Sequence, residues 1–395
     1  MKFWVLILTF TFLTTIRIAA QQADMTGSLN SFSFDLYKQL KFDKENLFFS
    51  PLSIDIALLM VREGARSETK SDFEKVLHIG STMNTKLAHD FILNLKSFKD
   101  STNRLSVANA IWIQNNYKIK TDFQNRIQAN YFEDVFRVNF LDPVKSATRI
   151  NTWTSQKTNN LIDNIISSDQ MNNNIKLLLT NAIYFIARWD REFYANQTIL
   201  DKFYGINCDS VEINFMHETG VLNYFENNDF QFISKYYKGN DKSFCVILPK
   251  VREGISSLEA TMNKPMLDSI FKQAVLSDVD LSLPKFKLEG SYSLNESLRK
   301  LGLKRAFSKD ADFSGISVQS KLKINEVLHK TYIQMNEFKT EAATVTSVYY
   351  TDGLMPVEPL KPETKVFNAN HPFLFMIVDT KTKGVIFMGR YVKKE

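Results

Sequence analysis

The sequence predicts one mixed α+β domain. Its first hundred residues have helical periodicity, whereas apolar, strand-like runs predominate further along the chain. The chain has 395 residues, of which 44% are apolar and 32 are Phe, so it can bury a sizeable core. We find no internal repeat and no linker-like segment. Helices and strands in one uninterrupted chain are most simply arranged as a single α+β domain.

Helical spacing is clear near the N-terminus. Apolar residues three or four positions apart form one helix face: Leu29, Phe32, Leu36 and Leu40. Further along, Ser71-x-x-Glu74 has the order of a capping box, in which a serine side chain and a glutamate three residues later satisfy free backbone N–H groups. This pattern predicts that a second helix begins at Ser71.

Later elements are predicted from apolar runs. Strands are expected at 105–113, 177–185, 243–248 and 279–288, and several of these runs are apolar on both faces, as in strands buried between layers. Helical stretches are expected around 121–138 and 291–301. An Asn-rich stretch at 159–174 should be a polar connector. The C-terminus predicts a hairpin, with strands at 373–378 and 385–388 and a turn at 379–384.

The N-terminus resembles a processing signal. A lysine precedes an apolar run over residues 3–16, and two alanines near its end offer a cleavage point. The run is short for spanning a bilayer. We therefore predict a signal peptide at 1–20 and a secreted, extracellular mature chain at 21–395. Arg17 beside the run leaves an uncleaved anchor as an alternative, and no later segment reaches membrane length.

A secreted chain can form disulfides and carry glycans. Cys208 and Cys245 are the two cysteines, and Cys245 lies in the apolar run 243–248, so we predict a buried free thiol there. One bridge between the two cysteines is the alternative. Asn196 and Asn295 both match the N-glycosylation pattern, and Asn196 is favoured because Asn295 lies in a predicted helix.

No local motif indicates an enzyme. The nucleophile elbow, the P-loop, the dinucleotide fingerprint and HExxH are all absent from the sequence. The histidines lack metal-ligand spacing: His78, His89, His217, His329 and His371. We expect no catalytic activity, no metal and no cofactor, although a triad dispersed along the chain would leave no local motif. The net charge of +6 is too modest to indicate a nucleic-acid partner.

The polar segment 336–346 is the most informative part of the chain. Every second side chain from Thr340 onward is small or β-branched, while the alternate ones can face outward. Such a segment could be exposed in one state and a buried strand in another. An ordinary surface loop is the alternative on composition alone.

Six segments, in their order along the chain, resemble the serpin family. They are Asn-Leu-Phe-Phe-Ser-Pro-Leu-Ser-Ile at 46–54, Gly-Ala-Arg-Ser-Glu-Thr at 64–69, Thr-Asn-Ala-Ile-Tyr-Phe at 180–185, Asp-Phe-Ser-Gly at 312–315, His-Lys at 329–330 and Phe-Asn-Ala-Asn-His-Pro-Phe at 367–373. The resemblance covers essentially the whole mature chain. It implies the α+β serpin fold, with three β-sheets, about nine helices and an exposed reactive loop at about 337–366.

The resemblance also implies a mechanism. In serpins the loop is bait: a protease attacks it and forms an acyl-enzyme, and the cleaved loop then inserts into the main sheet before the acyl bond is hydrolysed. Two sets of residues match the family's opening machinery. Those of the shutter, a polar cluster under the centre of the sheet, are Ser50, Ser53, Asn181 and His329. Those of the breach, where insertion begins, are Trp189, Lys285 and Glu337, of which the last two match an ion pair.

The hinge departs from the family pattern. It comprises Glu337, Phe338, Lys339, Thr340, Glu341, Ala342, Ala343, Thr344, Val345 and Thr346. Phe338 replaces an acidic residue, and Lys339 replaces a glycine whose freedom at positive φ suits a pivot, so the change can cost roughly 1 kcal/mol. The alternating small residues remain suitable for a strand. We therefore predict a protease inhibitor, with a non-inhibitory serpin-fold binding or carrier protein as the alternative.

The family's usual spacing from Glu337 places the reactive bond at Gly353-Leu354, with Tyr350 and Leu354 as other cleavage points. No Lys or Arg lies between 340 and 360, which argues against a trypsin-like target. We expect an elastase-, chymotrypsin- or subtilisin-like protease, with a papain-like protease as a cross-class possibility. The basic residues in the region where some relatives bind heparin form no dense stripe, so heparin binding is not expected: Lys86, Lys96, Lys99 and Arg104. We expect a monomer with no membrane partner.

Overall fold

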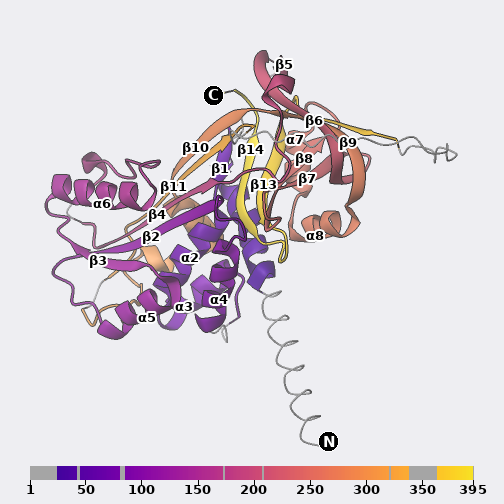
Figure 1. The fold of residues 1–395 in the computed structure, drawn as a ribbon. Coiled ribbons are helices and arrows are strands. Elements are labelled where there is room, and N and C mark those ends of the chain that lie inside the picture. Colours follow the sequence, from indigo (N-terminus) through magenta and orange to yellow (C-terminus); the bar gives the residue numbers. More distant parts are fainter. Residues whose placement is uncertain are drawn as a thin grey trace, which may run out of the picture.

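The computed structural model describes residues 25–41, 45–80, 85–171, 174–206, 209–319, 322–337 and 363–394. Within these ranges the chain forms nine α-helices, as the resemblance implies (Figure 1). They are 25–40, α2 (Pro51–Arg62), α3 (Ser67–Val76), α4 (Thr85–Lys96), α5 (Thr121–Tyr131), α6 (Pro143–Lys157), α7 (Ile255–Thr261), α8 (Lys264–Gln273) and α9 (Asn295–Leu301). No helix in the described ranges is long and apolar enough to cross a membrane.

A five-stranded sheet forms one half of the fold. Its order is β10 (Phe286–Ser293), β11 (Glu326–Met335), β4 (Leu177–Ile186), β2 (Arg104–Gln114) and β3 (Asp134–Val138). The central pair, β11 and β4, is parallel, whereas β10 and β2 are antiparallel to their inner neighbours. Figure 1 shows α6 on one face of this sheet and α2, α3 and α5 on the other.

The remaining strands form a larger hydrogen-bonded set. Its order is β1 (Leu47–Phe49), β14 (Val385–Tyr391), β13 (Phe373–Asp379), β8 (Lys242–Pro249), β7 (Phe230–Tyr236), β6 (Ser210–Glu226), β9 (Val275–Pro284) and β12 (Lys365–Asn368), with β5 (Ile199–Tyr204) paired to β6. β6 joins two parts, because it pairs with β7 only near its C-terminal end and with β9 along much of its length. With the five-stranded sheet this makes three sets of strands, as expected.

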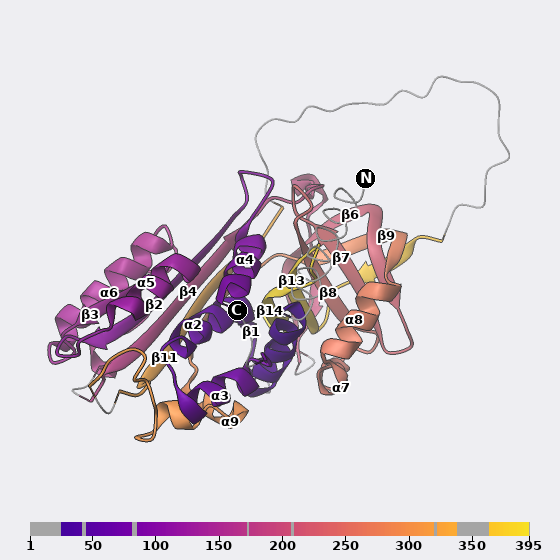
Figure 2. The same cartoon turned by 90° about the horizontal axis from the view of Figure 1, so that it is seen from below.

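The core is shared between the sheets. All residues of α2 are buried, and the helix contacts β2 and β4 on one side and β14 on the other, a central place that Figure 2 shows from below. Ser50 caps α2 by accepting from the Ser53 N–H, and Pro51 follows at the first helical position, where a missing N–H costs nothing. A smaller second core fills the space between the sheet and α6 and contains Trp112 and Phe140.

The predicted start of the second helix is wrong. α3 begins at Ser67, so Ser71 lies inside the helix and caps nothing. The earlier start follows from contacts distant in sequence: the Arg66 N–H donates to the Asp312 carbonyl, and the Ser67 hydroxyl donates to the Asp312 carboxylate. These contacts orient the first turn, and a local capping pattern contains no information about them.

Three other predicted boundaries are wrong because strand pairing overrides local pattern. Residues 134–138 are not helical but form β3, which pairs in parallel with β2 after the chain turns through left-handed Phe132 (φ 57°). Residues 291–293 are the end of β10 and pair with β11. The run 279–288 is two strands, β9 and β10, in different sheets, and Pro284 ends the first of them.

The other predicted strands are confirmed. The runs 105–113, 177–185 and 243–248 lie in β2, β4 and β8, and β13 and β14 form the C-terminal hairpin. In the described part of the Asn-rich connector, one short 3-10 helix occurs at Ser168–Gln170. Cys245 is a buried free thiol, and burial raises its pKa to about 11, while Cys208 lies outside the described residues.

Candidate functional site

The central parallel strands of the five-stranded sheet are paired along only part of their length. β11 and β4 pair from Glu326 opposite Leu178 to Tyr332 opposite Tyr184. Beyond that point β11 remains paired with β10 as far as Met335, and β4 remains paired with β2 as far as Ile186. The two strands therefore part from each other while each keeps its outer neighbour.

A buried polar network underlies the paired part. His329 of β11 and Asn181 of β4 are direct partners in the register, and the His329 Nδ1 hydrogen-bonds to the Asn181 side-chain oxygen. The His329 Nε2 accepts from the Ser50 N–H at 3.0 Å. Since Nε2 accepts, Nδ1 must carry the proton, so the neutral ring has one defined tautomer.

The network continues into the helix and the second sheet. The Asn181 amide donates to the Ser53 hydroxyl at 2.5 Å, and the Ser50 hydroxyl donates to the Ile386 carbonyl of β14 at 2.7 Å. All four residues predicted for the shutter are at most 1% exposed and lie in this one network. Separating β4 from β11 would break its hydrogen bond between His329 and Asn181.

Sequence reasoning missed two members of the network. Asn109 of β2 lies opposite Asn181 in the register and accepts from its amide, and the Asn109 N–H donates to Glu133 Oε2 at 3.2 Å. The other oxygen of Glu133 lies 3.6 Å from the Lys96 ammonium of α4. An Asn within the apolar run 105–113 was the available signal for Asn109; Glu133 follows α5 and had no local signal.

Burial controls the ionisation of this network. It lowers the pKa of His329 to about 3, so the ring is neutral at physiological pH. It raises the pKa of Glu133 to about 7, against the opposing attraction of Lys96. The neutral ring of His329 leaves no unpaired positive charge buried at this point of the network.

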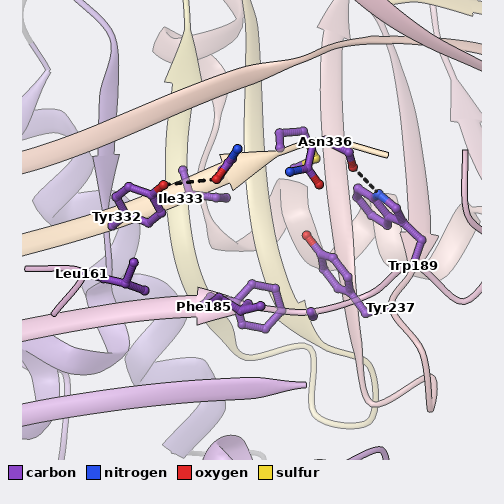
Figure 3. A pocket seen from close by; sticks show the side chains of 11 residues that line it. Leu161, Phe185, Trp189, Tyr237, Tyr332, Ile333 and Asn336 are labelled. Carbon is purple, nitrogen blue, oxygen red and sulfur yellow. Dashed lines mark hydrogen bonds between the residues drawn. The ribbon is translucent and has the colours of Figure 1, made fainter. Parts of the chain in front are cut away.

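Trp189 lies where β4 and β11 part. Its indole N–H donates to the Asn336 carbonyl at 3.0 Å, and its ring stacks on Tyr237 with centroids 4.6 Å apart (Figure 3). The indole thus joins the chain leaving β11 to the larger sheet.

An ion pair holds Glu337, the residue that follows Asn336. Glu337 Oε2 lies 2.7 Å from the Lys285 ammonium, and its other oxygen accepts from the Thr198 hydroxyl at 2.6 Å. Burial opposes ionisation of Glu337, but the Lys285 and Thr198 hydrogen bonds outweigh it and lower its pKa. The three predicted breach residues therefore lie at one end of the two central strands.

A buried lysine under Trp189 was also missed. The Lys235 ammonium lies 2.5 Å from Glu218 Oε1 and donates to the Arg191 carbonyl at 2.8 Å. It also lies over the rings of Trp189 and Phe193, 5.5 and 4.6 Å from their centroids. Burial lowers the pKa of this lysine. A lysine in an otherwise buried strand was the only sequence signal.

Other predicted positions are distributed as follows. The hinge residues 338–346 and the reactive bond Gly353-Leu354 lie outside the described residues, as does the predicted signal peptide 1–20. Asn196 is exposed in a 3-10 helix, whereas the Asn295 side chain donates to the Asn325 carbonyl and to Glu326 and accepts from a backbone N–H. Among the described His, Cys, Asp and Glu residues, no group could hold a metal ion.

The basic residues of the region considered for heparin are dispersed. Lys96 lies beside Glu133, and Lys99 lies 3.4 Å from Asp241. Arg104 is exposed at the start of β2, and the side chain of Lys86 lies outside the described part.

Comparisons with known proteins agree with this geometry. The family model "Serpin (serine protease inhibitor)" matches residues 27–394. An uncharacterized serpin-like protein of Thermococcus kodakarensis is 37% identical, over 94% of this chain and 86% of its own. A leukocyte elastase inhibitor of Xenopus tropicalis is 32% identical, over 93% of this chain and 99% of its own.

The crystal structure of human thyroxine-binding globulin in complex with thyroxine is also similar, with a TM-score of 0.83 and 26% identity, over 95% of this chain and 100% of the globulin chain. The family model spans nearly all of the described chain, and the similar solved structures are serpin folds. The chain therefore belongs to the serpin family.

Proposed function

We propose that this serpin inhibits proteases as a suicide substrate, by acyl-enzyme trapping and insertion of its reactive loop between β4 and β11. The observation that carries the proposal is the polarity of these strands. β11 ends at Met335, so a segment turning back from Glu337 into the sheet would run antiparallel to β11. Because β4 is parallel to β11, the same segment would also be antiparallel to β4.

This polarity supplies a driving force. Insertion would replace one parallel pairing with two antiparallel pairings, which are slightly more stable per residue. It would also bury every second side chain from Thr340, and these are small or β-branched. A protease held as an acyl-enzyme is trapped if insertion is faster than hydrolysis of the acyl bond. Insertion would have to break the hydrogen bond between His329 and Asn181, so this network would oppose it.

The target is proposed from the loop sequence. No basic residue lies between 340 and 360, and the bond Gly353-Leu354 offers small and apolar side chains. We propose an elastase-, chymotrypsin- or subtilisin-like protease, with a papain-like enzyme as a further target. One relative is named a leukocyte elastase inhibitor, which agrees with this choice. The protein itself would act as bait and not as a catalyst.

We further propose a secreted protein with a signal peptide at 1–20 and one mature domain at 21–395. Asn196 is the favoured glycan acceptor, because its side chain is exposed whereas that of Asn295 is engaged in hydrogen bonds.

A second candidate function rests on the hinge. Phe338 and Lys339 replace an acid and a glycine of the inhibitory pattern, and a stiffer pivot would slow insertion. The protein would then be a serpin-fold binding or carrier protein. Thyroxine-binding globulin, a structural neighbour, is named for such a role.

The two candidates differ in one experiment. The protein is incubated with pancreatic elastase, chymotrypsin, subtilisin and papain, and the products are separated under denaturing conditions. An inhibitor gives a covalent complex that survives denaturant with at least one protease. If the loop is only cleaved and no complex forms with any of the four, inhibition of these classes is refuted.

Two variants serve as controls. Thr340→Arg should turn an inhibitor into a substrate, because insertion would bury an unpaired charge. Glu341→Arg changes the neighbouring residue, whose side chain would face outward in the inserted strand because side chains alternate, so complex formation should persist. Equal loss of complex in both variants would contradict insertion in this register.

A further inference from the structure

A cavity of about 110 Å³ lies where β4 and β11 part. Its walls are mainly aromatic and aliphatic, and they come from the ends of β4 and β11 and from the segments that follow β4, β7 and α6: Leu161, Phe185, Trp189, Tyr237, Ile333 and Met335. Figure 3 shows Phe185 and Tyr237 on one side of the space and Ile333 and Asn336 on the other.

One polar group in this cavity has no partner. Tyr237 is 3% exposed, and its hydroxyl makes no hydrogen bond to any residue that the structure describes. In Figure 3 this hydroxyl points into the space below Asn336. The neighbouring polar groups are satisfied, since the Trp189 N–H donates to Asn336 and the Tyr332 hydroxyl donates to Gln334.

The Tyr237 hydroxyl can hydrogen-bond to a ligand. Burial raises the pKa of Tyr237 well above its usual value, so the group stays a neutral phenol that can donate or accept. The residue lines the cavity, so a ligand there that carries a complementary polar atom could hydrogen-bond to this hydroxyl.

Size and wall chemistry limit the ligand class. A cavity of about 150 Å³ lined by aliphatic and aromatic side chains binds benzene, so a space of about 110 Å³ suits one small ring. Rings pack well against Phe185 and Tyr237 in tilted or edge-on arrangements. A charged ligand is excluded, because the walls offer it no counter-ion.

We propose that this cavity binds a small, neutral, single-ring aromatic molecule with one hydrogen-bonding group, which pairs with the Tyr237 hydroxyl. The ring would contact Phe185 of β4 and Ile333 of β11 together. This last step rests on the proposed function: a bound molecule would oppose insertion of the reactive loop, because an inserted strand needs the space between β4 and β11.

Calorimetric titration of the intact protein with phenol and with benzene tests the site. Phenol should bind saturably, and Tyr237→Phe should weaken phenol binding about fivefold while leaving benzene binding within about twofold, since only the hydrogen bond is removed. Absence of saturable binding of both probes, or equal phenol affinity in the variant, would overturn the proposal.

Leu161→Trp gives a second test from another wall, independent of whether Tyr237→Phe folds. The larger side chain should fill the cavity and abolish binding of both probes, while full binding in this variant would place the ligand elsewhere and overturn the proposal. Circular dichroism checks that both variants keep the fold.

The effect on insertion is measured separately. The loop is nicked with elastase, and the gain in thermal stability is followed with and without phenol. A slower gain with phenol in the wild type, but no effect of phenol in Leu161→Trp, supports the coupling to insertion, and an unchanged rate at saturating phenol refutes it. If phenol binds but the nicked protein gains no stability, loop insertion fails while the binding site stands.

Discussion

At the scale of single residues, His329 shows how burial of a titratable side chain makes the stability of the folded protein depend on pH. Its pKa is about 3 in the folded protein, against a usual value of 6.5. As pH falls from 6.5 towards 3, the unfolded chain binds a proton that the folded chain does not. The folded state therefore loses stability in this interval, and it keeps the full contribution above pH 6.5.

This predicts a specific pH dependence. Between pH 7 and pH 5 the free energy of unfolding of the wild type should fall by about 2 kcal/mol relative to His329→Gln, which has no titrating ring. The comparison with the variant removes the opposite contributions of Asp55 and Glu133, whose pKa values burial raises to about 7. Urea unfolding at the two pH values measures the difference.

The surface residue His78 offers a matched control. It is 40% exposed in its side chain and pairs with Asp35 at the surface. The variant His78→Gln should follow the wild type between pH 7 and pH 5 to within about 1 kcal/mol, as expected for an exposed pair. If the free energy of unfolding of the two variants changed equally between pH 7 and pH 5, burial would not lower the pKa of His329 and the prediction would be wrong.

At the scale of elements, α6 and the segment after it lie across the strands that the proposed mechanism separates. The Asn159 amide donates to the Tyr184 hydroxyl of β4, and the Lys330 ammonium of β11 donates to the Asn164 carbonyl. This segment therefore spans both central strands. Trp153 holds α6 on the sheet through edge-on contacts with Trp112 and Phe136.

Weakening this packing should loosen the helix. Trp153→Ala is expected to lower the free energy of unfolding by about 2 to 4 kcal/mol, because it removes most of a large ring from a packed cluster. Amide hydrogen exchange in 143–157 should become faster than in the rest of the five-stranded sheet. Trp153→Phe keeps an aromatic ring and should show a smaller change. Uniform acceleration over the whole chain would instead indicate global destabilisation.

At the scale of the whole molecule, the proposed mechanism requires that the intact fold is not the most stable arrangement of the chain. Cleavage in the loop should raise the melting temperature by more than about 10 °C, since an added central strand gives two new pairings. Amide protection should rise in β4 and β11, and Thr340→Arg should lack most of the gain. A cleaved wild type that melts with the intact protein would contradict this arrangement.

Much of the architecture could be predicted from sequence because it depends on local pattern. Runs apolar on both faces predicted β2, β4 and β8, and the C-terminal hairpin followed from alternation around a polar turn. The six serpin-like segments identified the family, and the family model confirms it. Those segments also pointed to Asn181 and His329, which do lie in one buried network.

The errors and omissions share a physical cause, which is dependence on partners distant in the chain. Residues 134–138 form a strand only because β2 is available to pair with them. The buried Lys235 is stabilised by Glu218 on a neighbouring strand, and neither residue has a local sign of the other.

The sequence by itself determined the family, most strands and the alternating small residues of the hinge, since period, residue size and motif order are properties of neighbouring residues. Only the tertiary structure decided that β4 and β11 part beyond Tyr184 and Tyr332, that Asn109 and Glu133 extend the polar network, and that a cavity lies beside Tyr237. These features arise where separate segments meet, so they depend on distances and burial that no single segment contains.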